Sequence, residues 1–247
     1  MLSTQFVSQI RLRTEDIASF DTYPFSLPAV RNLDVLKLHP KVTFLVGENG
    51  SGKSTLLEAI AVSFGFNPEG GTKNFTFSSR ASHSELHRFL RLGKGFRQPR
   101  DGFFLRAESF FNLGTEIERL DREMGGPRII DSYGGRSLHE QSHGESFLSL
   151  LVNRFGGNGF YVLDEPEAAL SPQRQLAVLA RIHALASAGS QFIIATHSPI
   201  LMTYPDAFLY SCTETGLQLT TAEETEHFRI MQDFFKHPQR MLDVILS

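Results

Sequence analysis

A glycine-rich segment that begins at Gly47 constrains the fold of this 247-residue chain more than any other feature. It follows an apolar run, residues 42–46, that predicts a buried strand, and it precedes an apolar helical stretch, residues 54–64. The segment matches the pattern G-x-x-x-x-G-K-[ST], whose glycines let backbone amides surround phosphate groups. The matching residues and the one after them are Gly47, Glu48, Asn49, Gly50, Ser51, Gly52, Lys53, Ser54 and Thr55. The sequence therefore predicts a nucleotide-binding loop, in which Lys53 contacts the β- and γ-phosphates and Ser54 binds Mg²⁺.

Two carboxylates follow a second run that predicts a buried strand, residues 159–163. At the end of a buried strand, Asp164 is predicted to hold Mg²⁺ through its coordinated water, and Glu165 to orient or deprotonate the attacking water. We interpret Glu167 as a residue on the approach to the next helix rather than as a second base. The alternative is an acidic strand end that leads into a turn at Pro166. The phosphate loop in the same chain favours the catalytic interpretation.

The fold class predicted is α/β, a P-loop NTPase with a mostly parallel sheet, because short apolar runs alternate with longer helical segments. A further strand is expected at residues 191–195, and a helix after Ser171-Pro172 with an apolar stripe of Leu176, Leu179, Ile182 and Leu185. Residues 67–138 break this pattern and predict a small, partly helical insertion in a single domain whose core is 1–66 and 139–247. Residues 223–246 predict two short amphipathic helices that pack on the rest.

The amino-acid composition excludes several classes of protein. Hydrophobic residues make up 41% of the chain and charged residues 21%, values typical of a folded globular domain. A single cysteine, Cys212, excludes an internal disulfide and favours a reducing cytoplasm. The apolar runs are shorter than the roughly 18 residues that a membrane-spanning helix needs, so no direct membrane insertion is expected. With a net charge of -3, the chain lacks the overall positive field of a protein held mainly by phosphate backbones.

Two further segments resemble ABC-type ATPases. Ser142-His143-Gly144-Glu145-Ser146 resembles the ABC signature, although His143 replaces a glycine, and Thr196-His197-Ser198-Pro199 resembles the switch-histidine segment. This resemblance implies an ABC-type core that binds ATP and Mg²⁺. It also implies that Ser142, Gly144 and Glu145 meet a nucleotide held by another subunit, and that His197 is catalytic. The chain has no Asn-Lys-x-Asp string for guanine, which favours ATP over GTP.

Other family features are less regular in this sequence. The string from Ala168 to Pro172, with Ser171 where transporter subunits carry aspartate, looks like the soluble RecF-like, SMC-like and OLD-like branch. The place of the family's glutamine loop falls near residues 104–109, where Glu108 is a candidate metal ligand and Arg106 a candidate phosphate contact. The alternative there is a strand followed by a helix cap. Tyr23 or Phe25 would stack on the adenine, or either could belong to the core.

One chain carries one half of each split ABC site, so the resemblance implies a head-to-tail homodimer in the presence of ATP. We keep three uses open: a stand-alone ATPase in genome maintenance, an ATP-gated module of a toxin or defence system with a partner protein, and the energising subunit of a membrane transporter. Nucleic acid is a possible partner through a basic cluster, although a solvated helical face explains the same residues. The cluster comprises Arg80, Arg88, Arg91, Lys94, Arg97 and Arg100.

Overall fold

A six-stranded sheet forms the centre of the molecule in the computed structural model, which describes residues 5–72, 84–106, 110–123 and 128–247. Its strand order is β5-β6-β7-β3-β8-β9, and only the β8–β9 pair is antiparallel. The strands are β5 (Asp101–Arg106), β6 (Gly159–Asp164), β7 (Gln191–Ala195), β3 (Val42–Gly47), β8 (Phe208–Thr213) and β9 (Gly216–Thr220). The predicted α/β class and the strands at 42–46, 159–163 and 191–195 are confirmed.

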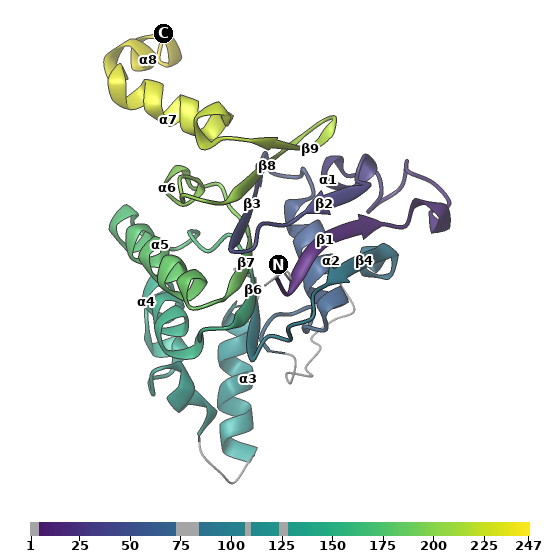
Figure 1. Cartoon of the computed structure of the whole chain (residues 1–247). Helices are drawn as coiled ribbons and strands as arrows, with labels where there is room; N and C mark the ends of the chain where they lie inside the picture. Colours follow the sequence, from purple (N-terminus) through teal and green to yellow (C-terminus); the bar gives the residue numbers. More distant parts are fainter. Residues whose placement is uncertain (1–4, 73–83, 107–109, 124–127) are drawn as a thin grey trace.

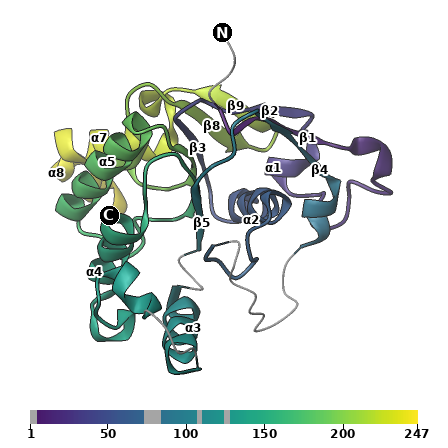
Figure 2. The same ribbon diagram turned by 60° about the horizontal axis from the view of Figure 1, so that its bottom comes forward.

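The central strands are apolar along their whole length because both faces of the sheet are covered. Alternate residues of β6 enter different cores: Tyr161 and Leu163 pack with the helices on one face, whereas Phe160 and Val162 pack with α2 (Lys53–Phe64) on the other. Figure 2 shows these two layers on opposite sides of the sheet. The phosphate-loop helix and the helices after residue 110 therefore lie on different faces.

A second, antiparallel sheet in the order β2-β1-β4 covers α2 and has no counterpart in the sequence-based prediction. Its strands are β2 (Val35–Lys37), β1 (Val7–Leu12) and β4 (Leu90–Lys94), and α1 (Pro28–Arg31) lies beside it. Strands β4 and β5 both come from the predicted insertion. That segment is therefore built into both sheets through backbone pairing between distant parts of the chain, and its α-helix begins at Phe110.

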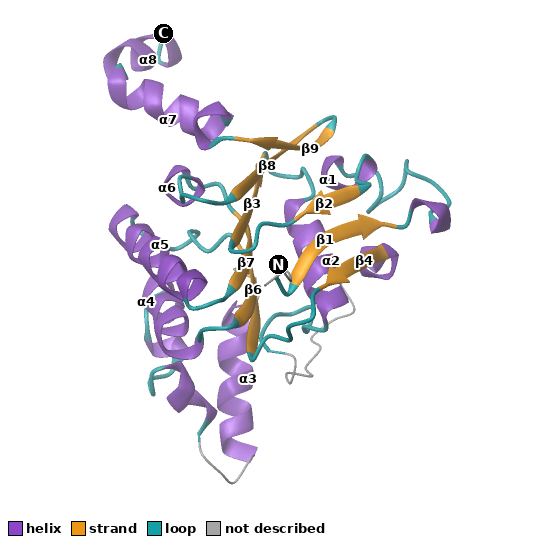
Figure 3. Cartoon of the chain, viewed as in Figure 1, coloured by secondary structure: helices purple, strands orange, loops and turns teal. Residues whose placement is uncertain are grey.

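The helices on the other face are α3 (Phe110–Glu123), α4 (His143–Ser149), α5 (Pro172–Ser187) and α6 (Pro199–Met202) (Figure 3). A π-helical turn, η6 (Leu150–Arg154), continues α4, and short 3₁₀ turns complete the chain: η1 (Thr14–Asp16), η2 (Glu85–Phe89), η4 (Ile129–Tyr133), η5 (Leu138–Glu140) and η7 (Ala222–Glu224). Ser171 caps α5 as predicted, but Leu176 is 59% exposed. Ile182 and Leu185 are buried as predicted, Leu179 packs part-buried against the core, and Val178 and Ala186 complete the buried face.

The C-terminal helices α7 (Glu226–Lys236) and α8 (Pro238–Ile245) occur where two amphipathic helices were predicted. They extend away from the sheets at one end of the molecule (Figure 1), and neither contains a buried residue. Phe228, in the first turn of α7, is the part-buried side chain that packs against the core. The predicted packing role thus holds only for the start of α7. In the part of the chain that the structure describes, no helix is long and apolar enough to cross a membrane.

Candidate functional site

The phosphate loop lies between the end of β3 and the start of α2, as the motif requires. Gly47 and Gly52 adopt φ values of 145° and 94°, which favour glycine. Close packing adds a second reason, since a Cβ at Gly47 would lie 2.8 Å from the carbonyl oxygen of Cys212 and one at Gly52 would lie 2.9 Å from Cβ of Leu27. The loop is therefore held in its curved shape by neighbours on two sides. The positive end of the 12-residue helix α2 points into it.

Lys53, the first residue of α2, is only 4% exposed. Its ammonium donates hydrogen bonds to the carbonyl oxygens of Gly47 and Glu48, each at 2.8 Å, and lies 3.4 Å from the Ser51 hydroxyl. Burial lowers the pKa of Lys53, an effect that the nearby Glu165 and other acidic groups oppose. The arrangement puts a cation inside the loop, within reach of any anion bound there.

Ser54 and Asp164 come together from distant parts of the sequence. The Ser54 hydroxyl donates to Oδ1 of Asp164 at 3.0 Å, and Asp164 is 6% exposed at the end of β6. Two adjacent oxygen ligands beside a phosphate loop suit Mg²⁺, which takes few protein ligands and completes its shell with phosphate oxygens and water. No group of three or more His, Cys, Asp or Glu side chains that could hold a metal ion occurs among the described residues. The oxygen pair fits a magnesium ion that arrives with its nucleotide.

Glu165 and His197 meet just beyond the ends of β6 and β7. Oε1 of Glu165 lies 3.4 Å from Nε2 of His197, and the Glu165 amide donates to the carbonyl of Ala195 at 3.0 Å. Glu165 has a φ of 49°, an uncommon left-handed conformation for a residue with a side chain. This backbone turn directs the chain away from the sheet immediately after Asp164. Burial and the nearby Lys53 lower the pKa of His197, which favours its neutral form.

Glu167 holds the backbone of the histidine segment. One of its carboxylate oxygens accepts hydrogen bonds from the amides of His197 and Ser198, at 2.6 and 3.1 Å. Burial raises the pKa of this carboxyl group. The sequence-based interpretation of Glu167 as a helix-approach residue missed this contact, which joins two segments 30 residues apart.

The signature-like segment forms the start of α4. Ser142 caps the helix, and its hydroxyl and the Glu145 carboxylate each accept from the other residue's amide in a capping box. Arg174 of α5 donates to both side chains, at 3.5 Å to Ser142 and 3.3 Å to Glu145. A Cβ at Gly144 would lie 2.7 Å from the carbonyl oxygen of Ala169. Close contact with the loop before α5 therefore explains why position 144 needs glycine.

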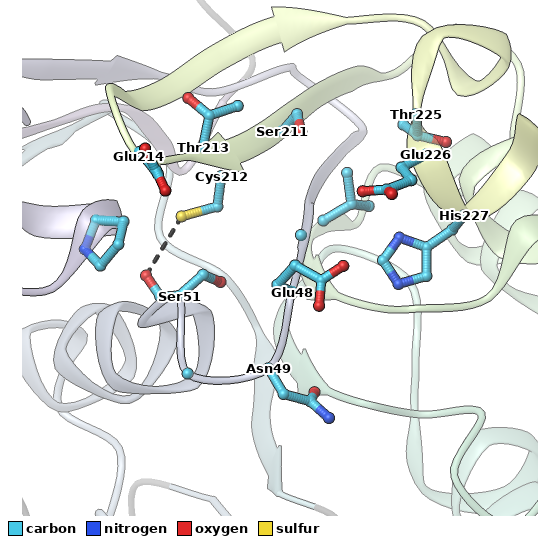
Figure 4. Close-up of a pocket in the computed structure, with 14 residues that line it drawn as sticks. Glu48, Asn49, Ser51, Ser211, Cys212, Thr213, Glu214, Thr225, Glu226 and His227 are labelled. Carbon is cyan, nitrogen blue, oxygen red and sulfur yellow. Dashed lines mark hydrogen bonds between the residues drawn. The ribbon is translucent and has the colours of Figure 1, made fainter.

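A cavity of about 470 Å³ adjoins the outer side of the phosphate loop. Figure 4 shows Glu48 and Asn49 of the loop on one wall and Glu226 and His227 of α7 facing them. Cys212 belongs to β8, and its thiol donates to the Ser51 carbonyl of the loop at 3.3 Å. The first turn of α7 thus belongs to the surroundings of the phosphate loop.

Several other predicted residues lie elsewhere. Glu108 falls outside the described residues, and Arg106 ends β5 with an ion pair of 2.7 Å to the buried Glu58 rather than with a free guanidinium. Phe25 is 6% exposed and packs edge-on against neighbouring rings, so it belongs to the core, whereas Tyr23 is 64% exposed. Of the two candidates for stacking on adenine, only Tyr23 offers an accessible ring.

Two residues of the site were not anticipated from the sequence. Arg174 supports the signature-like segment, and His227 lies beside His197, with Nε2 3.2 Å from Nδ1. No local pattern marks either residue, because each acquires its neighbour only through tertiary packing.

Two protein-family models match this chain. Residues 11–109 match a family described as "AAA domain", and residues 130–203 match one described as "AAA domain, putative AbiEii toxin, Type IV TA system". The chain is a P-loop ATPase of the AAA/ABC type. The first match includes the phosphate loop, and the second includes the signature-like segment, the acidic pair and His197. This ATPase is thereby assigned to a class of enzymes that hydrolyse ATP.

Individual relatives of this ATPase carry transporter names. It is 26% identical over 189 residues to a "Putative ABC transporter ATP-binding protein" of Methanothermobacter marburgensis, covering 71% of this chain and 67% of that protein. It is 27% identical over 182 residues to the ABC transporter G family member STR2 of Medicago truncatula, covering 67% of this chain but only 25% of that protein. The structure of a "putative metal-chelate type ABC transporter" has a TM-score of 0.50 at 14% identity, over 92% of this chain and 88% of that one, which supports the ABC ATPase fold. These matches do not single out the RecF-, SMC- and OLD-like branch.

Proposed function

We propose that this ATPase binds MgATP between two copies of itself and hydrolyses it with Glu165 as the base that activates water. The observation that carries the proposal is the meeting of Lys53, the Ser54–Asp164 pair and the Glu165–His197 pair at the ends of three neighbouring strands. Carboxyl ends of parallel strands are where such folds bind ligands. The pieces required for phosphoryl transfer are thus within one small region.

Each side chain has a part in the proposed reaction. The phosphate loop and Lys53 bind the triphosphate, and Ser54 and Asp164 hold the magnesium ion, which neutralises charge on the β- and γ-phosphates. Glu165 accepts the proton of the attacking water. The Nε2–H of His197 donates to a γ-phosphate oxygen, and Glu167 keeps the His197 backbone in place.

The position of α4 supports a site shared between subunits. Ser142 and Gly144 start a helix that lies on the opposite face of the central sheet from α2 and Lys53 (Figure 2). Within one chain the signature-like residues are therefore separated from the phosphate loop by the sheet. A second copy in head-to-tail orientation would bring Ser142, Gly144 and Glu145 to the nucleotide, and ATP would then hold the dimer together.

The test is the oligomeric state of Glu165→Gln with MgATP. We expect an ATP-bound dimer of about twice the 27.7 kDa monomer and a turnover rate lowered about 10²–10⁴-fold. Lys53→Ala is the matched control, since it removes the loop cation and should give neither dimer nor hydrolysis. A strictly monomeric Glu165→Gln variant that retains bound ATP would contradict the shared site.

We propose that the dimer uses ATP hydrolysis to act on a partner protein or on nucleic acid, in genome maintenance or in defence. The family description that names a toxin system favours the defence role. The second candidate, an energising subunit of a membrane transporter, is favoured by the names of the relatives. Purification of trapped Glu165→Gln from its native cells distinguishes them, because a transporter subunit would bring a membrane protein with it. The cytoplasmic location stays a prediction.

Nucleic acid binding rests on five exposed cations of η2, β4 and the following loop: Arg88, Arg91, Lys94, Arg97 and Arg100. Arg80 lies outside the described residues. Arg11 adds a further positive charge directly across the strand pair from Arg91. Contacts by these five residues predict a slope of about -4 to -5 in a plot of log affinity against log salt for duplex DNA. Binding without salt dependence, or no binding, would exclude this role.

A further inference from the structure

His227 connects the start of α7 to the histidine of the ATPase site. Its Nε2 lies 3.2 Å from Nδ1 of His197, and the ring centroids are 5.2 Å apart at an interplanar angle of 57°. His227 also lines the cavity beside the phosphate loop (Figure 4). One nitrogen of His197 thus faces α7, and the other faces Glu165 at 3.4 Å.

The protons on the two rings follow from these contacts. A neutral imidazole carries one N–H, and a carboxylate only accepts hydrogen bonds. The His197 nitrogen that faces Glu165, Nε2, is therefore the one that carries the proton. Nδ1 of His197 is then an acceptor, and Nε2 of His227 must be the donor. The lowered pKa of His197, caused first by burial and then by Lys53, agrees with a neutral ring.

Nε2 of His197 is buried, and its contact of 3.4 Å with Glu165 does not have hydrogen-bond geometry, so it makes no hydrogen bond among the described residues. A buried N–H without an acceptor lowers the stability of the folded protein, so such a group is expected where it donates to a bound ligand. In the proposed reaction this group donates to a γ-phosphate oxygen. If the proton moved to Nδ1, the Nε2 lone pair would face both Glu165 and the phosphate, and the site would lose its donor.

The first turn of α7 fixes the position of His227. Thr225, 4% exposed, caps the helix: its hydroxyl donates to the Ala222 carbonyl at 2.6 Å and lies 3.4 Å from the Phe228 amide. Phe228 packs against the core. The cap and this packing hold His227 against His197, although the rest of α7 is exposed to solvent.

We propose that His227 is a positioning residue for the ATPase reaction, which donates a hydrogen bond from Nε2 to Nδ1 of His197 and so keeps the His197 proton on Nε2. The inference rests on the proposed function, in which Nε2 of His197 contacts the γ-phosphate. Sequence motifs do not mark this role, since His227 lies 30 residues beyond His197.

The test compares His227→Ala with His227→Gln in the full chain. Glutamine places an amide N–H at about the reach of the histidine Nε2 and remains a donor at any pH. We expect His227→Ala to lower kcat about 10–100-fold, the typical effect of removing a residue that orients a functional histidine, with KM for ATP within about threefold. His227→Gln should restore kcat to within about threefold of wild type. Gln232→Ala, an exposed change on the same helix, is the control and should leave both constants unchanged.

The ¹⁵N chemical shifts of the His197 ring report which nitrogen carries the proton. They would not change if His227 had only a structural role. Wild type and His227→Gln should show His197 protonated on Nε2, and His227→Ala should show a mixture of tautomers, with the His197 signals assigned from His197→Ala. An unchanged tautomer in His227→Ala would overturn the proposal. Circular dichroism of each variant checks that it is folded.

A double mutant separates failure of this inference from failure of the proposed function. His197→Ala/His227→Ala should be no slower than His197→Ala, because His227 acts only through His197. Additive losses, or a His227→Gln variant as slow as His227→Ala, would refute the positioning role. A His197→Ala variant with unchanged kcat would instead refute the proposed role of His197 itself.

Discussion

Replacement of Glu167 tests how the histidine segment is held. In the folded protein one carboxylate oxygen accepts hydrogen bonds from the amides of His197 and Ser198. Glu167→Ala removes that acceptor and leaves the part-buried His197 amide without its partner, whereas the Ser198 amide still has the Thr196 hydroxyl at 3.0 Å. Glu167→Gln keeps an amide oxygen in its place and has the shape of the protonated acid.

The expected loss of stability follows from the one amide that is left without an acceptor. A buried donor in that state costs about 1–3 kcal/mol, and here this donor is the His197 amide. Removal of a carboxyl group whose burial already raises its pKa offsets part of this loss. We expect Glu167→Ala to lower the free energy of unfolding by about 1–3 kcal/mol, and Glu167→Gln to change it by less than about 1 kcal/mol.

The assay is urea unfolding followed by circular dichroism, since the chain contains no tryptophan. Steady-state ATP hydrolysis by the same variants separates a structural role from a catalytic one. If Glu167 were a second base, Glu167→Gln would hydrolyse ATP at least about 10²-fold more slowly than wild type. If Glu167 only holds the backbone, the rate of Glu167→Gln stays within about threefold of wild type. Equal stability of the two variants would refute the hydrogen-bond argument.

Three further predictions concern pH, the signature-like segment and the second sheet. Because the folded-state pKa of Glu167 is raised, the folded protein binds its proton more tightly than the unfolded chain does. The free energy of unfolding should therefore fall as pH rises from the ordinary glutamic acid pKa through the raised one, and this part of the profile should be missing in Glu167→Gln. Gly144→Ala puts a methyl group 2.7 Å from the Ala169 carbonyl. It should weaken ATP-dependent dimerisation in sedimentation experiments while monomers still bind ATP, and full dimerisation would contradict the close contact. Gln191→Leu removes the side-chain oxygen that accepts from two buried amides of the first strand region. It should cost about 2–6 kcal/mol in urea unfolding, whereas Gln218→Leu on exposed β9 should change stability by less than about 1 kcal/mol.

The local sequence pattern predicted the strands that are completely covered by neighbouring elements. Strands β3, β6 and β7 are buried on both faces, so each is a continuous apolar run that can be recognised without knowing its partners. Strands β1, β2 and β4 have exposed polar residues and pair between segments that are separated in the sequence. Their pairing is a tertiary event, and β4 and β5 were therefore assigned to an insertion.

The sequence by itself determined the chemistry available to this ATPase. The loop from Gly47 to Ser54 specifies phosphate binding through its own backbone. Glu165 is predicted to be catalytic from its place at the end of a buried strand, and His197 from the resemblance of its segment to that of ABC-type ATPases. Tertiary structure decided which side chains support them. Arg106 pairs with Glu58, Glu167 holds the His197 backbone, and His227 reaches the His197 ring. These contacts depend on the direction and burial of side chains that are distant in the chain, and no local spacing encodes them.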